Sequence, residues 1–374
     1  MQNLSRVSLI LAIILLACTP RANAQTSANA RPTISDLLAP IRVENELPAI
    51  AAAIFNSQGM IESGVVGVRN IDDPTAATID DLWHLGSCTK AMTATMIATL
   101  VDEGKLDWTT TLAEVFPGEA PAMDPACRGI TLEQLLTHRS GLPVNGAWRQ
   151  LGKNRTTTDQ RLELLRRVTA PSPTSEPGSE YVYSNVGFAI AGLMAETVTG
   201  TPWETLMRDR VFTPLRMTDV GFGVAGTIGK IDQPWGHYRS LLGLGPLEPL
   251  QLDNAPSLGP AGTIHASLAS WANFCALHLR PKNDLVTQTT WQRLHTPPDG
   301  GAYAMGWNVF EREWAGGKSL NHAGSNTINF CVCWLAPERD FGVLVATNAF
   351  QTNAPVALDK VASLLIDRVL AERD

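Results

Sequence analysis

The sequence predicts an α/β protein of the α+β type, in which one antiparallel sheet is assembled from the two ends of the chain. Apolar runs of strand length occur within about residues 31–104 and again within about 255–374, whereas about 105–254 shows mainly helical periodicity. Strands at both ends with helices between them indicate one shared sheet and a mainly helical inserted region. The chain of 374 residues is long enough to bury a large core.

The N-terminal elements are a short helix and a β-hairpin. Ile34 to Val43 has helical periodicity, with Ser35 as the expected N-cap. Ala49 to Phe55 and Ile61 to Val68 are runs of small and β-branched residues, separated by the turn sequence Asn56-Ser57-Gln58-Gly59. We therefore expect the sheet to begin with these two strands.

Helical segments follow the hairpin. A long apolar helix is predicted to begin at Ser87 and to end at Gly104, because glycine commonly terminates helices. Further helices are predicted over Thr131 to His138, Asp159 to Val168 and Val186 to Thr199.

The C-terminal third returns to strands. Tyr303 to Phe310, Asn329 to Leu335 and Phe341 to Ala346 alternate or are continuously apolar, and Pro337 to Asp340 reads as a turn. Val356 to Leu370 closes the chain as an amphipathic helix.

The first 24 residues have the layout of a secretory signal peptide. A charged start is followed by the apolar stretch Val7 to Ala17, and the small residues Ala22-Asn23-Ala24 provide a cleavage site. An alternative is a lipoprotein in which Cys18 is acylated, but the bulk of Leu16 disfavours it. We expect cleavage after Ala24, a secreted, periplasmic protein, no transmembrane segment in the mature chain, and a single catalytic unit over residues 25–374.

The charge of the mature chain is acidic. Removal of residues 1–24 removes Arg6 and Arg21 and no acidic residue, which leaves 27 basic against 36 acidic side chains, a net charge of −9. This charge argues against nucleic acid or an anionic membrane as the main partner.

The cysteines and histidines do not form a recognisable framework. Five cysteines remain after cleavage, and an odd number without Cys-x-x-Cys pairs favours packing, although the sequence also allows one disulfide. These residues are Cys88, Cys127, Cys275, Cys331 and Cys333. The seven histidines are scattered without metal-ligand spacing, so we expect neither a metal nor a cofactor.

The most informative local pattern is the Ser-x-x-Lys at the start of the long apolar helix. If the helix begins at Ser87, Lys90 lies one turn later on the same face, within reach of the serine hydroxyl. A lysine with a lowered pKa can take the serine proton and so activate the nucleophile. Taken alone, the pattern also fits an N-cap serine followed by a surface lysine.

Two further segments supply partners. Tyr183 and Asn185 form a Tyr-x-Asn ahead of an apolar helix, where the tyrosine could relay a proton and the amide could hold a substrate carbonyl or the lysine. His322 and Gly324 form a His-x-Gly in a strand region, where a substrate backbone could approach closely. Each pattern alone also has a structural interpretation, as a helix-capping asparagine or as an ordinary turn between strands.

Taken in order, the three motifs resemble those of the serine β-lactamase and penicillin-binding protein superfamily. The chain is most similar to the branch of class C β-lactamases, D-alanyl-D-alanine carboxypeptidases and β-lactamase-like esterases. The resemblance implies a β-lactamase/transpeptidase-like fold and a serine hydrolase. It covers almost the whole mature chain and includes Leu85–Ser87, Leu135–Pro143, Trp235–Tyr238, Pro260–Gly262 and Met305–Trp307.

The resemblance also implies roles for the catalytic residues. Ser87 would be the acylated nucleophile, and Lys90 with Tyr183 would carry its proton to the leaving group. Asn185 would orient Lys90 and the substrate amide. The backbone N–H groups of Ser87 and Ser325 would form the oxyanion hole.

Substrate binding would fall to His322 and Gly324 on the strand, and to Asn145, which matches an amide that binds the acyl side chain in class C enzymes. The substrate would be a small ester, a peptide or a β-lactam, and we expect a monomer. No glutamate of the class A deacylation loop is identifiable, which is consistent with the Tyr-x-Asn branch.

The chain departs from the class C pattern at two places. His322 replaces a lysine that offers a permanent cation to the substrate carboxylate, and a histidine of ordinary pKa near 6.5 is mostly neutral at pH 7. The run Ser325 to Asn329 is bulky where many relatives have an open strand edge. We therefore expect a narrower or more polar cleft that favours a small ester or a particular peptide over a β-lactam.

Alternative functions stay open at this point. His138 and His237 suggest a Ser/His triad, but the chain has no Gly-x-Ser-x-Gly elbow. Esterase and D,D-peptidase activities are equally compatible with the motifs, and a true class C β-lactamase is less so. A non-catalytic penicillin- or peptidoglycan-binding sensor would have no need of Lys90 and Tyr183 together.

Overall fold

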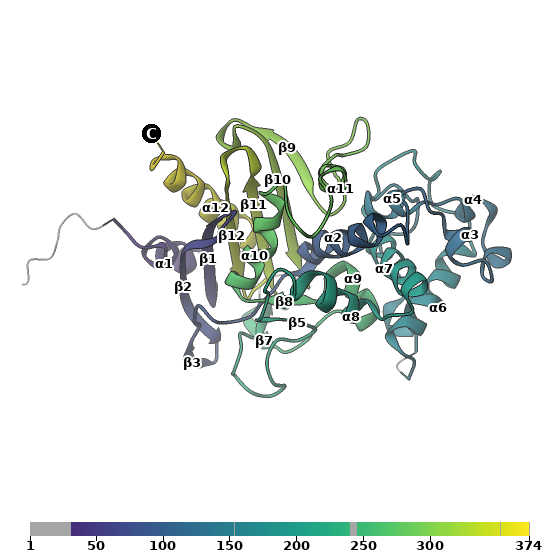
Figure 1. The fold of residues 1–374 in the computed structure, drawn as a ribbon. Coiled ribbons are helices and arrows are strands. Elements are labelled where there is room, and N and C mark those ends of the chain that lie inside the picture. Colours follow the sequence, from purple (N-terminus) through teal and green to yellow (C-terminus); the bar gives the residue numbers. More distant parts are fainter. Residues whose placement is uncertain (1–30, 153, 240–244, 352, 374) are drawn as a thin grey trace, which may run out of the picture. The chain divides into compact units, whose positions relative to one another are not determined.

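A seven-stranded antiparallel sheet organises the computed structural model, which describes residues 31–373 apart from 153, 240–244 and 352 (Figure 1). The predicted signal peptide, its cleavage site and Cys18 lie outside the described residues. The strand order is β3 (Asp73–Ala76), β2 (Gly59–Asn70), β1 (Ala49–Asn56), β12 (Phe341–Thr347), β11 (Phe330–Ala336), β10 (Gly317–Ser325), β9 (Asn308–Arg312).

The first and last strands of the chain pair at the centre of this sheet. β1 and β12 are antiparallel, in a register that runs from Ile50 opposite Thr347 to Phe55 opposite Gly342. The prediction of one sheet built from both ends of the chain is confirmed.

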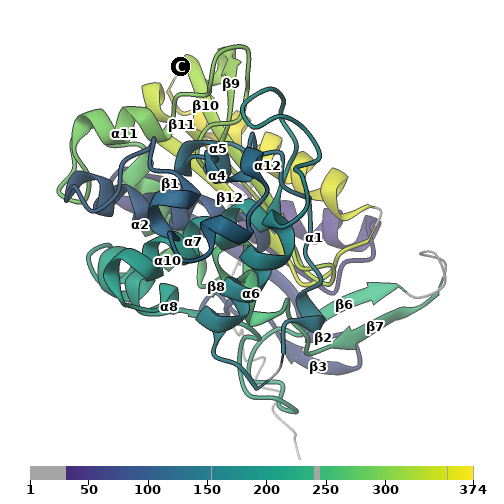
Figure 2. The same ribbon diagram turned by 90° about the vertical axis from the view of Figure 1, so that its right-hand side faces the viewer.

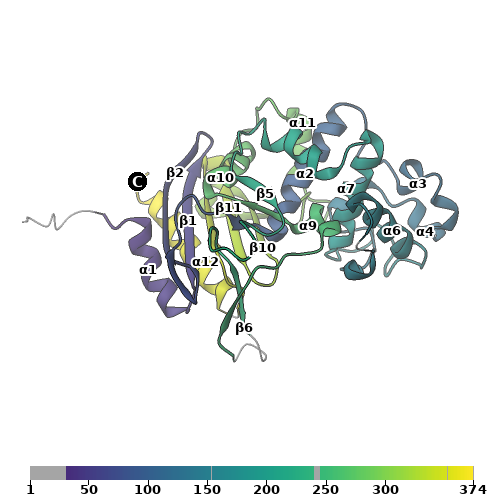
Figure 3. The same ribbon diagram turned by 90° about the horizontal axis from the view of Figure 1, so that it is seen from below.

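Both faces of the sheet are covered, as the continuously apolar sequence of β1 requires. Successive side chains of a strand point to opposite faces. Ala51 and Phe55 therefore join the larger core, beneath α2 (Thr89–Asp102) and α10 (Leu268–His278). Ile50 and Ile54 join a second core, with α1 (Ile34–Glu44) and α12 (Ala354–Leu370) on the other face (Figure 3).

Helices gather at the end of the unit away from α1 (Figure 1). They are α3 (Leu112–Val115), α4 (Pro125–Arg128), α5 (Leu132–Leu136), α6 (Thr157–Thr169), α7 (Asn185–Thr199) and α8 (Trp203–Met207). The chain then returns to the sheet through α9 (Gly259–Gly262), and α11 (Gln288–Leu294) precedes the C-terminal strands.

Short strands interrupt the predicted helical region. β5 (Val220–Phe222) joins β4 (Trp83–His84) and β8 (Ile264–Ala266) in a small sheet that supports the segment before Ser87. β6 (Gly236–Arg239) and β7 (Leu247–Leu250) form a two-stranded ribbon beside β2 and β3 (Figure 2).

Two predicted boundaries at the chain ends differ from the structure. The N-cap of α1 is Thr33 rather than Ser35, because Thr33 and Asp36 form a reciprocal capping box. The strand predicted from Tyr303 begins only at Asn308. The preceding residues form a turn in which Gly306 has φ +88°, and a Cβ there would lie 2.5 Å from the Cα of Ala91 on α2.

The cysteines pack as predicted. All five in the described residues are free thiols and buried. Cys88 lies 3.7 Å from Cys331 between their sulfur atoms, at the contact between the start of α2 and β11.

Candidate active site

Ser87 lies in a single 3₁₀ turn, Gly86–Cys88, that leads into α2. The helix itself begins at Thr89, and no side chain caps it, so the predicted start at Ser87 and the N-cap interpretation are both wrong. The amide of a residue in a first helical turn has no partner inside the helix, which leaves the Ser87 N–H free for a ligand.

Two glycines let this turn touch strand β10 backbone to backbone. Gly86 has φ +47°, and a Cβ there would lie 2.2 Å from the Ser325 nitrogen. A Cβ on Gly324 would lie 2.0 Å from the Leu85 oxygen and 2.9 Å from the Ser87 nitrogen. Any larger residue at either position would therefore separate Ser87 from Ser325.

The structure brings Ser87, Lys90 and Tyr183 together. The Ser87 hydroxyl oxygen lies 3.0 Å from the Lys90 amine and 2.8 Å from the Tyr183 hydroxyl. Lys90 is three residues along the chain, and Tyr183 comes from the segment that precedes α7. These are hydrogen-bond distances for a nucleophile held between two proton carriers.

Lys90 is fully buried without an acidic partner among the described residues. Its amine donates to the Ala261 carbonyl at 2.7 Å and lies 4.8 Å from the centre of the Tyr183 ring. Burial lowers the pKa of Lys90 to about 7, because the charged amine has lost its water, and the nearby Cys88 only partly offsets this. A large fraction of the amine is therefore neutral near pH 7.

Tyr183 is held by His138, which follows the end of α5. Burial raises the pKa of the Tyr183 phenol, and its bond to Ser87 opposes this shift only in part. The His138 ring packs on the Tyr183 ring at 4.2 Å between centres, and His138 Nδ1 accepts the Ser184 backbone N–H. Tyr183 is thus a protonated phenol at neutral pH, with its ring fixed by packing.

The amide pair predicted for substrate binding is present. Asn185 donates from Nδ2 to Oδ1 of Asn145 at 2.9 Å, and both residues are at least partly exposed. The cap of α7 is Ser184, which accepts the Gly187 N–H, and Asn185 is the first helical residue. We expected Asn185 to orient Lys90, but the Ala261 carbonyl binds the amine in its place.

His322 differs from the expectation of an ordinary, substrate-facing histidine. Only 4% of its surface is exposed, and burial lowers its pKa to about 3, with repulsion from Lys90 adding to the effect. Its ring nitrogens lie 2.7 Å from the Ala323 carbonyl and 3.0 Å from the Tyr303 hydroxyl. The sequence does not reveal this contact of Tyr303, because the run Tyr303 to Phe310 is typical of a strand.

His138 and His237 do not complete a triad with Ser87. His138 bonds the Ser184 backbone, and His237 lies on β6, where its ring meets the Asn348 carbonyl and the Ile71 N–H. Among the described residues neither contacts Ser87 by a hydrogen bond. The Ser/His alternative therefore has no structural support.

The bulky run after Gly324 is a turn rather than a strand edge. β10 ends at Ser325, whose hydroxyl accepts the Thr327 N–H at 2.8 Å. Asn326 is buried and binds Asn329 and Asp253, and Thr327 is exposed. Within this run Asn326, Ile328 and Asn329 are buried, whereas Ser325 and Thr327 are at least partly exposed.

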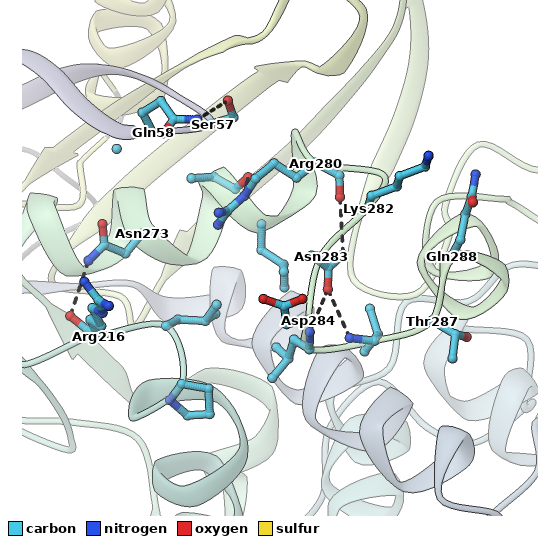
Figure 4. A pocket seen from close by; sticks show the side chains of 17 residues that line it. Ser57, Gln58, Arg216, Asn273, Arg280, Lys282, Asn283, Asp284, Thr287 and Gln288 are labelled. Atoms are coloured by element: carbon cyan, nitrogen blue, oxygen red, sulfur yellow. Dashed lines mark hydrogen bonds between the residues drawn. The ribbon is translucent and has the colours of Figure 1, made fainter.

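A sizeable cavity lies away from these residues. It has a volume of about 830 Å³ and is lined by the β1–β2 turn, the end of α10 and the segment before α11, including Asn273, Arg280 and Asp284 (Figure 4). None of the predicted site residues lines it. In the part of the chain that the structure describes, no cluster of side chains could hold a metal ion, and no helix is long and apolar enough to cross a membrane.

Comparison with known proteins decides the family. The model of the beta-lactamase family matches residues 32–368. The chain belongs to the beta-lactamase family. Members of this family are serine hydrolases.

Individual relatives have low sequence identity to this chain, but they match most of its length. Penicillin-binding protein 4 of Amycolatopsis lactamdurans is 26% identical over 331 residues, which cover 82% of each chain. Other curated relatives are longer, and the chain spans 52% to 64% of their length.

Two solved structures share the fold. The octameric penicillin-binding protein homologue from Pyrococcus abyssi has a TM-score of 0.75 at 21% identity and covers 90% of this chain and 77% of its own. The D-amino acid amidase from Ochrobactrum anthropi SV3 has a TM-score of 0.74 at 18% identity, and the match covers 91% of this chain and 99% of the amidase. The predicted β-lactamase/transpeptidase-like fold is confirmed.

Proposed function

We propose that this chain is an exported serine hydrolase that cleaves an ester or amide bond through an acyl-enzyme on Ser87. One observation carries the proposal: a single serine oxygen lies within 3.0 Å of both a buried, carboxylate-free lysine amine and a tyrosine hydroxyl. A chance surface serine would have neither partner.

The acylation step follows from the protonation states of the two partners. Neutral Lys90 has a lone pair that can accept the Ser87 proton, and its N–H bond to the Ala261 carbonyl holds the amine in place. As the proton moves to Lys90, the Ser87 oxygen attacks the substrate carbonyl carbon and a tetrahedral oxyanion forms. The N–H groups of Ser87 and Ser325 would stabilise that oxyanion.

Collapse of the oxyanion expels the leaving group, which needs a proton. Tyr183 stays protonated at neutral pH and already donates to the Ser87 oxygen, so its hydroxyl can pass a proton to the departing atom while Lys90 replenishes it. Water then attacks the acyl-enzyme, with the same groups in reverse order. Asn185 and Asn145 would bind the acyl side chain of the substrate.

The relatives support a carbonyl substrate of this kind. The similarity to a penicillin-binding protein and to a D-amino acid amidase is consistent with ester or amide cleavage. A true class C β-lactamase is the second candidate, favoured only by the complete motif set. A non-catalytic sensor would gain nothing from the lowered pKa of Lys90.

Export rests on the N-terminal sequence. We propose that residues 1–24 are removed as a signal peptide and that the mature protein is a periplasmic monomer. Mass spectrometry of the purified mature protein would find Gln25 at its N-terminus, and a start at an acylated Cys18 would contradict this. Light scattering would test the monomer, since one homologous structure is octameric.

The decisive experiment uses p-nitrophenyl esters and a fluorescent penicillin with the wild-type protein and Ser87→Ala. We expect ester turnover and a covalent adduct on Ser87, both lost in Ser87→Ala and retained in the control Ser172→Ala, which alters an exposed loop serine. Ester turnover that persists in Ser87→Ala would refute the proposal. Fast penicillin release would indicate a β-lactamase, and stable labelling without ester turnover a sensor or peptidase.

A further inference from the structure

Tyr303 contacts His322, the side chain at the position where the resemblance to class C enzymes places a carboxylate-binding lysine. It lies in the turn before β9 and is 4% exposed. Its hydroxyl is 3.0 Å from Nε2 of His322, with the two rings nearly perpendicular at 75°. Its ring also packs on His138, at 4.6 Å between centres, so it belongs to the aromatic cluster around Tyr183.

The partners of His322 fix where its proton lies. The Ala323 carbonyl can only accept, so Nδ1, at 2.7 Å from it, carries the ring hydrogen. In the neutral ring Nε2 is then a lone pair, and the Tyr303 hydroxyl must donate to it. The polar hydrogens of the Tyr303 and His322 side chains are therefore both donated to acceptors within the protein.

We propose that Tyr303 is a specificity-determining residue that, by donating its hydroxyl hydrogen to His322, selects substrates whose leaving group carries no carboxylate. The proposal rests on the proposed acyl-enzyme function and narrows its substrate class to uncharged esters or amides. It concerns binding beside strand β10, not the chemistry at Ser87.

A carboxylate placed beside this pair would find no donor on it. A buried carboxylate needs hydrogen bonds or an opposite charge, and its loss of water is otherwise uncompensated. Desolvation and the nearby Lys90 keep the pKa of His322 far below neutrality, so the ring does not become a cation there. An ester or amide leaving group has no charge to desolvate and avoids this cost.

Lys90 and Arg139 lie near this pair, and only Arg139 has capacity left to bind a carboxylate. The Lys90 amine binds Ser87 and the Ala261 carbonyl. Arg139 donates to the Gly178 carbonyl at 3.4 Å and lies near Gly301, two residues before Tyr303. Arg139 is therefore the group to which a bound carboxylate would have to turn.

A matched substrate pair tests the proposal directly. 3-Acetoxybenzoate and its methyl ester deliver the same acyl group, and their leaving groups differ only in a carboxylate. Each kcat/KM is divided by the hydroxide-catalysed rate to remove the difference in intrinsic reactivity. We expect the wild-type protein to prefer the methyl ester by about tenfold or more.

Variants then assign the preference to Tyr303. Tyr303→Phe removes the donated hydrogen and lets His322 take up a proton more readily, so the preference should narrow by about threefold at pH 6 and less at pH 8. His322→Lys should narrow or reverse it at both pH values. Tyr181→Phe removes a hydroxyl from the same aromatic cluster without touching His322, and should leave the ratio unchanged.

The outcomes separate this proposal from the proposed function. A wild-type preference for the carboxylate would overturn it and would point to Arg139. An unchanged ratio in a folded Tyr303→Phe, or the hydrogen of His322 found on Nε2 by ¹⁵N NMR, would also overturn the role of Tyr303. Turnover of both esters that survives Ser87→Ala would instead refute the acyl-enzyme function.

Discussion

Among the residues that the structure describes, two cationic side chains, Arg161 and Lys90, are completely buried, and their surroundings are opposite in kind. Arg161 on α6 donates to the carboxylates of Glu196 at 2.5 Å and Glu204 at 2.7 Å. Lys90 on α2 meets a hydroxyl and a carbonyl, and no carboxylate among the described residues. The first arrangement holds a charge in place, and the second removes it.

The difference follows from the chemistry of the two side chains. A guanidinium is always protonated in proteins, so a buried arginine must be paired, and its planar fork suits several acceptors. Arg161 also binds the carbonyls of Ser257 and Pro256, and so joins α6, α7, α8 and the segment before α9. An amine can lose its proton, and burial without a counter-charge makes Lys90 a base near neutral pH.

The largest expected effect is at Lys90. Lys90→Met should lower kcat for p-nitrophenyl esters by about 10³-fold, because the general base is lost. It should also raise the free energy of unfolding by roughly 2–4 kcal/mol at pH 7, since the unfolded chain protonates this lysine readily and the folded protein does not. Urea unfolding and steady-state kinetics measure the two effects.

The sign of the stability effect has its own check. The lowered pKa of Lys90 makes wild-type stability rise with pH between about 7 and 10.5, so the gain from Lys90→Met should shrink as the pH is raised. Lys90→Arg is the control, because it is inactive for the same reason but buries a permanent charge and should destabilise the protein. Activity retained by either variant would exclude Lys90 as the base.

The second prediction concerns Arg161, where we expect a loss of stability without a loss of activity. Arg161→Met leaves Glu196 buried without its partner, and the free energy of unfolding should fall by about 3–5 kcal/mol. The kcat/KM of the folded fraction should stay near the wild-type value, because Arg161 lies outside the group around Ser87. The control is Arg166→Met on the same helix, whose exposed pair with Glu119 should cost less than about 1 kcal/mol. A fall in kcat/KM that exceeds the loss of folded protein in Arg161→Met would mean that Arg161 also contributes to catalysis, and would contradict this comparison.

The two cations also differ in how far the sequence predicts them. The sequence predicts Ser87, Lys90 and Tyr183 because each lies in a short local motif, and the structure places the three together. Arg161 has no such signal. Its carboxylate partners lie 35 and 43 residues away on two other helices, and only the packing of those helices brings them close.

The sequence also does not predict the protonation states and the individual hydrogen bonds of the site. The Tyr303–His322 bond joins a turn to a strand, and the turn was hidden because an apolar run with one glycine reads as a strand. The continuously apolar runs of β1 and β12 are sufficient to predict the central sheet. They are insufficient to predict that the Ala261 carbonyl, rather than Asn185, binds the Lys90 amine.

The smallest expected effect is the change of kcat/KM with each pH unit. It compares the two cations directly, because Lys90 titrates in this range and Arg161 does not. Because the base must be neutral, kcat/KM should rise about tenfold per pH unit below the pKa of Lys90 and level off above about 7. The raised pKa of Tyr183 should keep the plateau flat beyond pH 9. Arg161→Met should reproduce this profile within the range where it stays folded, since Arg161 does not titrate there. A rise that levels off only near pH 10 would mean that Lys90 is an ordinary lysine, and that burial without a carboxylate does not activate it.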